Sequence, residues 1–201
     1  MTTPPATLAR VRQVLAQPPE RAARDLLGAL LVRRLGDGRI LRARIVETEA
    51  YLGAGDPAAH SFRGPTPRTA PIWGPPGTVY VYFIYGMHHC LNVTVDAEGV
   101  AGCVLIRAAE PLPDSDLTPL DLRGPGRLCR ALAIDTRLSG TSVFTRGGPL
   151  GLRAGPAPAR TGVSPRVGIR LAADLPLRFY DADSAAVSRA GRTLRRGRRT
   201  R

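Results

Sequence analysis

The stretch RIVETEAY, residues 44–51, places two carboxylates inside a sequence that otherwise has the composition of a buried strand. Isoleucine, valine and alanine supply its apolar side chains, and β-branched residues are typical of strands. Alternate side chains of a strand point to the same face, so Glu47 and Glu49 share a face, about 6.6 Å apart by strand rise alone unless a bulge intervenes. The stretch therefore predicts a strand that carries a carboxylate pair.

Two interpretations of this carboxylate pair stay open at the level of sequence. In the first, apolar surroundings and mutual repulsion raise the pKa of at least one carboxylate, as general-base catalysis requires. In the second, the strand face is solvated and one glutamate pairs with an arginine. Spacing alone favours the second, because most charged strand faces are solvated.

The segments on either side of this strand predict a mixed α/β pattern. Before it, apolar residues recur at i, i+4, i+7 and i+8 within residues 20–34, which predicts a helix with one buried face. Turn residues at positions 36–38 then lead into a strand pair that contains residues 40–50. After it, residues 53–76 are rich in Gly, Pro, Ser and Thr and too long for an ordinary connection, so we expect a functional loop.

Later segments extend this pattern with further strands and one helix. Residues 78–95, TVYVYFIYGMHHCLNVTV, predict a second hairpin that turns at Tyr85-Gly86-Met87. Residues 101–110 predict another strand, and Pro125 predicts a short helix with proline in its first turn. Short strands are also expected at two places late in the chain, residues 167–171 and 177–180.

The length and composition suit one domain. The chain has 201 residues, of which 43% are hydrophobic, enough to bury a core but too few for a confident division in two. We expect one domain over residues 1–187, with its core at about 20–183, and a disordered tail over residues 188–201, which holds seven arginines and no acid. The expected fold class is α/β of the α+β type, with a central mixed, largely antiparallel curved sheet, flanking helices and a protruding β-hairpin.

The basic residues are all arginines, and they give the chain a net charge of +13. Guanidinium groups pair bidentately with phosphate and release condensed counterions on binding, so a nucleic acid is the leading candidate partner. Genomic base composition is the simplest cause of the missing lysines. Whatever the cause, no lysine side chain can form a Schiff base here.

Several sequence features predict the cellular compartment of the protein. The longest apolar stretches are shorter than the roughly 20 residues that cross a bilayer, so no membrane partner is expected. The N-terminus lacks the apolar core of a signal peptide, and the three cysteines have no disulfide spacing. We therefore expect a cytoplasmic protein, associated with the nucleoid in a bacterium.

The aromatic residues and histidines gather between positions 47 and 92. Tyr80 and Tyr82 share one strand face, while Tyr85 lies at the end of the expected hairpin. Such tyrosines are most often half-buried sheet residues, but in a chain with this charge they also suit stacking on bases or insertion into a base stack. Two adjacent histidines in the hairpin point to opposite faces, and paired Cys or His spacing is absent, so we expect no metal site.

Four ordered blocks of the sequence resemble the alkyladenine (3-methyladenine) DNA glycosylases. These blocks are RIVETEAYLGAGDPAAHSFRGPTPRT, GPPGTVYVYFIYGMHHCLNV, CVLIRAAEPL and GPGRLCRAL. The resemblance runs from about Arg24 to Tyr180 and implies a fold similar to that of this family and of the formyltransferase C-terminal domain. Three places depart from the family pattern: Arg127 stands where lysine is frequent, Ile72-Trp73 replaces a common Met-Phe pair, and residues 177–179 lack a nearby tryptophan.

The resemblance implies which residues carry the chemistry. Glu49 would be the general base that deprotonates the attacking water, and Arg107 would help to hold that water and the carboxylate. No catalytic role is implied for Glu47, for which we expect a structural one.

The resemblance also implies a pocket for an extruded base. Tyr51, His60 and Tyr82 would line this pocket and sandwich the base, and Asn92 would disfavour the exocyclic amine of guanine. Tyr85 would insert into the minor groove and fill the gap that the flipped nucleotide leaves.

The implied activity is that of a monofunctional DNA glycosylase. It would flip alkylated or deaminated purines, of the 3-methyladenine, hypoxanthine and ethenoadenine class, out of duplex DNA and leave an abasic site. We expect a monomer that binds double-stranded DNA with damaged purines and needs neither cofactor nor metal; lyase chemistry would depend on the amine of Met1. Two other classes stay open, a non-catalytic architectural protein of the minor groove and an RNA-binding protein.

Overall fold

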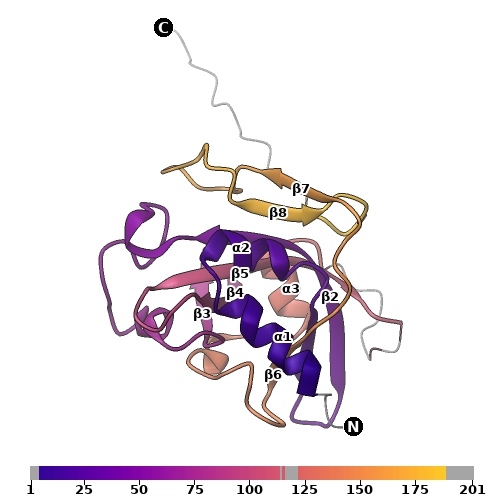
Figure 1. Cartoon of the computed structure of the whole chain (residues 1–201). Coiled ribbons are helices and arrows are strands. Elements are labelled where there is room, and N and C mark those ends of the chain that lie inside the picture. The colour runs from indigo at the N-terminus through magenta and orange to yellow at the C-terminus, as the bar shows by residue number, and fades with distance from the viewer. Residues whose placement is uncertain (1–4, 114, 116–121, 189–201) are drawn as a thin grey trace, which may run out of the picture.

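One curled sheet organises the part of the chain that the computed structural model describes, residues 5–113, 115 and 122–188 (Figure 1). Its strands follow the order β3-β4-β5-β2-β1-β6, and β7 and β8 continue it beside β2. Each of these strand pairings is antiparallel. The strands are β1 (Leu30–Arg34), β2 (Ile40–Tyr51), β3 (Val79–Ile84), β4 (His88–Val95), β5 (Gly102–Pro111), β6 (Leu150–Arg153), β7 (Thr161–Ser164) and β8 (Arg178–Asp181).

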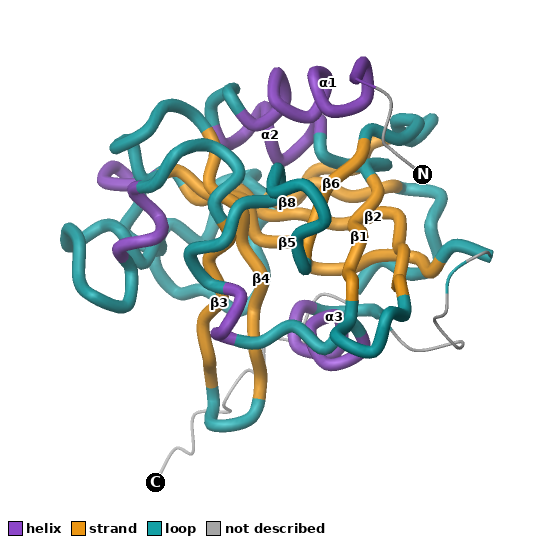
Figure 2. The backbone as a smooth tube through the Cα atoms, turned by 90° about the horizontal axis from the view of Figure 1, so that it is seen from below, coloured by secondary structure: helices purple, strands orange, loops and turns teal. Residues whose placement is uncertain are grey.

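Helices cover both sides of this sheet, which confirms the expected α/β class. They are α1 (Pro5–Leu15), α2 (Pro19–Asp25) and α3 (Pro125–Ala131), with short 3₁₀ helices at Gly53–Gly55, Ala70–Trp73 and Thr136–Leu138. Figure 2 shows α1 and α2 on one side of the sheet and α3 on the other. The first pair packs against β2, β5 and β6, and α3 packs against β4 and β5. Within the described ranges, no helix is long and apolar enough to cross a membrane.

The central strand β2 explains how the two glutamates come to be buried. One of its edges pairs with β5 along most of its length. The other edge is shared, because β1 pairs with residues 40–44 and β8 pairs with residues 47–49. The register shifts on either side of Glu47, which marks a β-bulge there. Thr48 then bonds the α2 carbonyl of Ala23, so Glu47 and Glu49 face away from that helix.

The helix predicted over residues 20–34 is wrong in its second half. α2 ends at Asp25, and residues 30–34 form β1 instead. Gly28 adopts a φ of +84°, and a Cβ there would lie 1.9 Å from the carbonyl oxygen of Pro156. The chain therefore turns at this glycine, after the end of α2 and two residues before β1. β1 then gains hydrogen bonds from β2 on one edge and β6 on the other, and this pairing overrides the helical spacing of its leucines.

The other predicted elements are mostly confirmed. Both hairpins, the strand at residues 101–110 and the helix that begins at Pro125 are present. The strand expected at residues 167–171 is wrong, because this segment forms an irregular loop while the strand lies earlier, at β7. α1 and β6 have no counterpart in the sequence prediction.

The C-terminal end of the described chain is anchored at Ser188. This residue, the first of the predicted tail, is buried, and its backbone N–H donates to Glu47. The folded part of the chain thus reaches at least Ser188. The remaining residues of the predicted tail, 189–201, lie outside the described residues.

Candidate active site

A cavity of about 490 Å³ opens beside the second hairpin. Its wall includes all of the pocket residues predicted from the sequence, together with Arg107 and the loop at residues 167–169. These pocket residues are Tyr51, His60, Tyr82 and Asn92. The volume lies within the range of small-ligand sites, about 300–1,000 Å³. Residues from well-separated parts of the chain thus converge on one recess.

One wall of the cavity is a cluster of three rings. His60 meets Tyr82 edge-on, with ring centroids 4.5 Å apart, and its Nδ1 lies 2.9 Å from the hydroxyl of Tyr80. Tyr80 and Tyr82 are 5.7 Å apart between centroids. Burial and the nearby charge of Arg68 lower the pKa of His60, so its imidazole is neutral at pH 7. The hydrogen bond to Tyr80 fixes the orientation of the histidine ring. From the sequence, Tyr80 is expected only to share a strand face with Tyr82.

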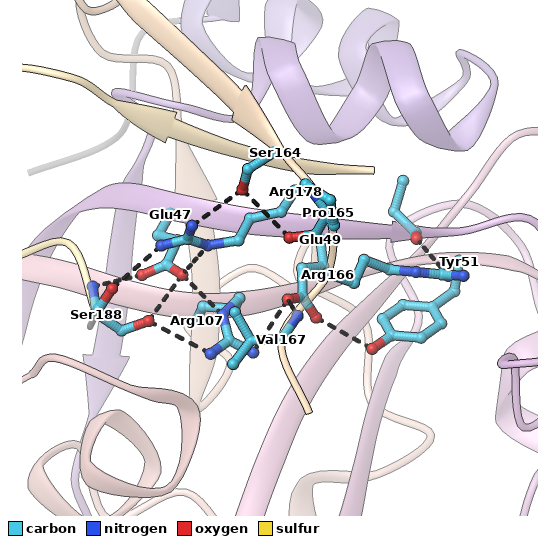
Figure 3. A network of polar contacts seen from close by, with 11 residues as sticks. Glu47, Glu49, Tyr51, Arg107, Ser164, Pro165, Arg166, Val167, Arg178 and Ser188 are labelled. Carbon is cyan, nitrogen blue, oxygen red and sulfur yellow. Dashed lines mark hydrogen bonds and ion pairs between the residues drawn. The ribbon is translucent and has the colours of Figure 1, made fainter. Parts of the chain in front are cut away.

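Glu49 is fully buried, and Figure 3 shows it among Arg107, Val167 and Tyr51. Its Oε1 accepts a hydrogen bond from the backbone N–H of Val167 at 2.7 Å and lies 3.2 Å from Nη1 of Arg107. Its Oε2 accepts one from the Tyr51 hydroxyl at 3.1 Å. Glu49 does not itself line the cavity, but all three partners do. Burial raises the pKa of Glu49, and this effect exceeds the opposing charge of Arg107.

Arg107 on β5 joins the two glutamates of β2. Its Nε donates to Oε1 of Glu47 at 2.8 Å, while Nη1 reaches Glu49. Both carboxylates have no exposed surface, so the interpretation of a solvated strand face is wrong. Burial raises the pKa of Glu47, but the charges of Arg107 and Arg178, together with hydrogen bonds from Arg178 and Ser188, outweigh burial and the pKa is lowered overall. The two carboxylates therefore differ: Glu47 ionises more readily than an ordinary glutamate, and Glu49 is more basic.

Tyr85 stands at the tip of the second hairpin, as predicted. It is 77% exposed, and its φ of 56° places it in the left-handed region of the turn. Figure 2 shows this hairpin extending beyond the rest of the sheet. Tyr85 also contributes to the mouth of the cavity. An exposed ring on a projecting turn can enter a partner without displacing the core.

Two cysteines, Cys90 and Cys103, also line the cavity. Burial raises the pKa of both thiols, that of Cys103 to about 12. They are therefore protonated and poor nucleophiles at neutral pH. No cluster of three or more His, Cys, Asp or Glu that could hold a metal ion occurs among the described residues.

The sequence prediction missed the arginines that support the site. Arg166 forms a buried ion pair with Asp56 and lies 4.7 Å from the Tyr51 ring centroid. Arg178 bonds Glu47 from β8. In a chain with 29 basic residues, all arginines, residue type carries no signal that separates these two from the exposed ones.

Most of the chain matches one known protein family. Residues 13–185 match the family described as Methylpurine-DNA glycosylase (MPG). The chain belongs to the methylpurine-DNA glycosylase family. A relative from Synechococcus elongatus is 51% identical over 180 residues, which cover 89% of this chain and 90% of the relative.

Two further relatives come from distant organisms. A protein of Methanoculleus marisnigri is 50% identical over 83% of this chain and 92% of its own length, and one of Myxococcus xanthus is 46% identical over 87% and 90%. All three relatives are provisionally named 3-methyladenine DNA glycosylase. The match to the family over residues 13–185 thus covers both hairpins and the residues that line the cavity.

Proposed function

We propose that this protein is a monofunctional DNA glycosylase that hydrolyses the N-glycosidic bond of alkylated or deaminated purines in duplex DNA. The observation that carries the proposal is the position of Glu49, a fully buried carboxylate held by three residues that line an aromatic cavity. The provisional names of the relatives support a substrate of the 3-methyladenine class.

Such a substrate has to leave the base stack before it can react. A base inside a duplex is out of reach, and extruding it costs a few kcal/mol, least for damaged or mismatched pairs. In the proposed complex, Tyr51 and Tyr82 stack on the extruded base, and Tyr85 takes its place in the helix. Stacking contributes about 1–3 kcal/mol per base, so these rings offset the cost of extrusion.

Glu49 supplies the base for the hydrolytic step. Its Oε1 is engaged by Val167 and Arg107, whereas Oε2 accepts only the Tyr51 bond from the part of the chain that the structure describes. Oε2 is therefore the atom that takes the proton from water as the water oxygen attacks C1′. The C1′–N bond breaks and its electron pair passes to the purine. A positioned general base contributes about 10²–10⁴-fold to such a rate.

Selectivity follows from the base and from the pocket. Alkylation at N3 or N7 makes a purine cationic, so it leaves readily and is attracted to electron-rich rings. Asn92 is buried, and its Nδ2 donates to the backbone oxygens of Tyr80 at 3.2 Å and Cys90 at 3.4 Å. These two hydrogen bonds hold the Asn92 amide in place. A fixed side chain in the pocket wall supports a steric role for Asn92 against the 2-amino group of guanine.

The test is excision from a panel of duplexes, each with a single hypoxanthine, ethenoadenine or 3-methyladenine. We expect the wild type to release the free base and to leave the strand intact until alkali is added, because no lysine is available for lyase chemistry. Glu49→Gln should bind the same duplexes and lose roughly 10²–10⁴-fold in single-turnover rate. Glu110→Gln, in which a partly exposed glutamate loses the charge that pairs with Arg44, is the matched control and should keep the wild-type rate.

Three results would contradict parts of this proposal. Equal excision by Glu49→Gln would remove Glu49 from its role, and strand breaks before alkali would exclude a monofunctional enzyme. Tight, bent binding of duplex DNA with no base released from any lesion would favour an architectural minor-groove protein instead.

A further inference from the structure

The other glutamate of the strand, Glu47, lies at the centre of a second buried network (Figure 3). Its Oε1 accepts from Nε of Arg107 at 2.8 Å, from Nε of Arg178 at 2.7 Å and from Oγ of Ser188 at 2.8 Å. Its Oε2 accepts from the backbone N–H of Ser188 at 2.6 Å. Four donors match the roughly four lone-pair sites of an ionised carboxylate, so buried Glu47 is fully hydrogen-bonded.

This network fixes the orientation of the Arg107 guanidinium. Nε of Arg107 donates to Glu47 and Nη2 donates to Oγ of Ser188 at 3.3 Å, so one edge of the planar group is occupied. Only Nη1 remains directed at Glu49, at 3.2 Å. Because the guanidinium is planar and rigid, contacts on three nitrogens fix its plane.

Arg178 completes the balance of charge. It bonds Glu47 through Nε, and its Nη groups donate to Oγ of Ser164 and the carbonyl of Ser188. Two guanidiniums thus face two carboxylates, Glu47 and Glu49. With both carboxylates ionised, the buried group is neutral, which is the condition under which such a cluster is stable in a low-dielectric interior.

We propose that Glu47 is a positioning residue for the hydrolytic step: with Ser188 it engages Nε and Nη2 of Arg107, so that a single guanidinium nitrogen reaches Glu49. The inference rests on the proposed function, in which Glu49 is the general base. If the occupied edge of Arg107 were released, it could turn to Glu49 and form a bidentate pair, the strongest kind of arginine–carboxylate contact. Such a pair would occupy the lone pairs that a general base needs.

Several groups face Glu49 and set its protonation. Arg107 approaches from β5, Tyr51 and Glu47 from β2, and Arg166 and Cys90 from neighbouring segments. Burial raises the pKa of Glu49 most, Arg107 lowers it, and the like charge of Glu47 raises it. Loss of the Glu47 charge therefore lowers the pKa of Glu49, and a turn of Arg107 toward Glu49 acts in the same direction.

The test compares Glu47→Gln with Glu47→Asp by single-turnover excision across pH. In Glu47→Gln we expect the rate on the pH plateau to fall about 10²-fold, the scale of a misplaced catalytic group. The acid limb of the profile should move to lower pH, with lesion-duplex Kd unchanged. Glu47→Asp keeps the charge, so its acid limb should stay where the wild-type limb lies. Glu110→Gln is again the matched control.

A merely structural Glu47 gives a different result. The inference is overturned if Glu47→Gln keeps the wild-type rate, or if its rate falls while the acid limb does not move. If Glu47→Gln does not fold, Ser188→Ala decides: it removes the Oγ that contacts both Glu47 and Arg107 and keeps the backbone bond. We expect about a tenfold loss of rate, the effect of one hydrogen bond, and none for Ser184→Ala, whose hydroxyl bonds Glu110.

An unchanged rate in Ser188→Ala would also overturn the inference. Failure of the proposed function looks different, because then the wild type itself releases no base from any lesion duplex.

Discussion

The Tyr51 hydroxyl donates a hydrogen bond to Oε2 of Glu49 over 3.1 Å, from two residues further along the same strand. Burial and the charge of Glu49 raise the pKa of Tyr51, so the hydroxyl keeps its hydrogen at neutral pH. The bond stabilises ionised Glu49 and so lowers its pKa, against the larger opposite effect of burial. One side chain thus presents a ring to the cavity and tunes the proposed base.

Tyr51→Phe separates these two roles. The ring stays, but ionised Glu49 loses a donor, so its pKa rises. Because the reaction needs the ionised form, the acid limb of the excision profile should move to higher pH, while lesion-duplex binding is retained. The measurement is single-turnover rate against pH, with Tyr180→Phe on β8 as the control. An acid limb that stays in place or moves to lower pH would show that the Tyr51 bond does not act on the base.

The ion pair of Arg166 and Asp56 holds the far side of Tyr51 in place. Both side chains have no exposed surface, and two bonds join them, Nη1 to Oδ2 at 2.5 Å and Nη2 to Oδ1 at 2.9 Å. Arg166→Met leaves the Asp56 carboxylate buried without its partner. We expect a loss of about 3–5 kcal/mol in the free energy of unfolding, measured by denaturant titration at pH 7. Arg160→Met, which breaks an exposed pair with Asp183, should change stability far less.

The same pair predicts how stability depends on pH. Burial raises the pKa of Asp56, but its bonds to Arg166 and to the backbone N–H groups of Ala58 and Leu52 together outweigh burial and lower the pKa below the ordinary value of 3.8. The wild type therefore has this contribution in full above pH 3.8 and loses it as pH falls through the lowered pKa. If the free energy of unfolding fell by the same amount in the wild type and in Arg166→Met as the pH is lowered, this assignment would be contradicted.

Strand periodicity accounts for how much of the cavity could be predicted. Tyr82 and Asn92 come from the two strands of one hairpin, and β4 in turn pairs with β5. β5 pairs with β2 so that Tyr51 lies opposite Cys103. Once these paired strands are predicted, the side chains on their shared face are expected to line one wall of the cavity. The resemblance to known glycosylases then gave each position its expected role.

The parts that could not be predicted depend on contacts between distant segments. Arg166 and Arg178 reach β2 from more than a hundred residues later in the chain. Arg178 lies on β8, which pairs with Glu47–Glu49, and Arg166 follows β7, which pairs with β8. Ser188 follows the same path. The helix predicted over residues 20–34 is wrong for a related reason. The pairing of β1 with β2 and β6 outweighs the helical spacing of its apolar residues.

The charge of the chain predicts a steep dependence of DNA binding on salt. If six to ten phosphates are contacted, affinity should fall by roughly 10³–10⁵-fold between about 50 and 200 mM salt. Arg127 lies on α3 and lines the cavity, so Arg127→Gln should reduce the slope of log Kd against log salt by about one. Arg39→Gln, in the turn between β1 and β2, is the control. A shallow slope in the wild type would place the arginines away from the DNA.

Tyr85 offers the most direct test of how the protein engages duplex DNA. Its ring is exposed at the tip of the hairpin, so removing it costs the free protein little. If the ring fills the gap left by an extruded nucleotide, Tyr85→Ala should weaken lesion-duplex binding by about 5- to 150-fold, equivalent to about 1–3 kcal/mol of stacking. Tyr85→Phe keeps the ring and should bind like the wild type. The loss should be smaller when the lesion lies in a mismatched pair, because extrusion then costs less. Equal binding by Tyr85→Ala and the wild type would show that another residue occupies the gap.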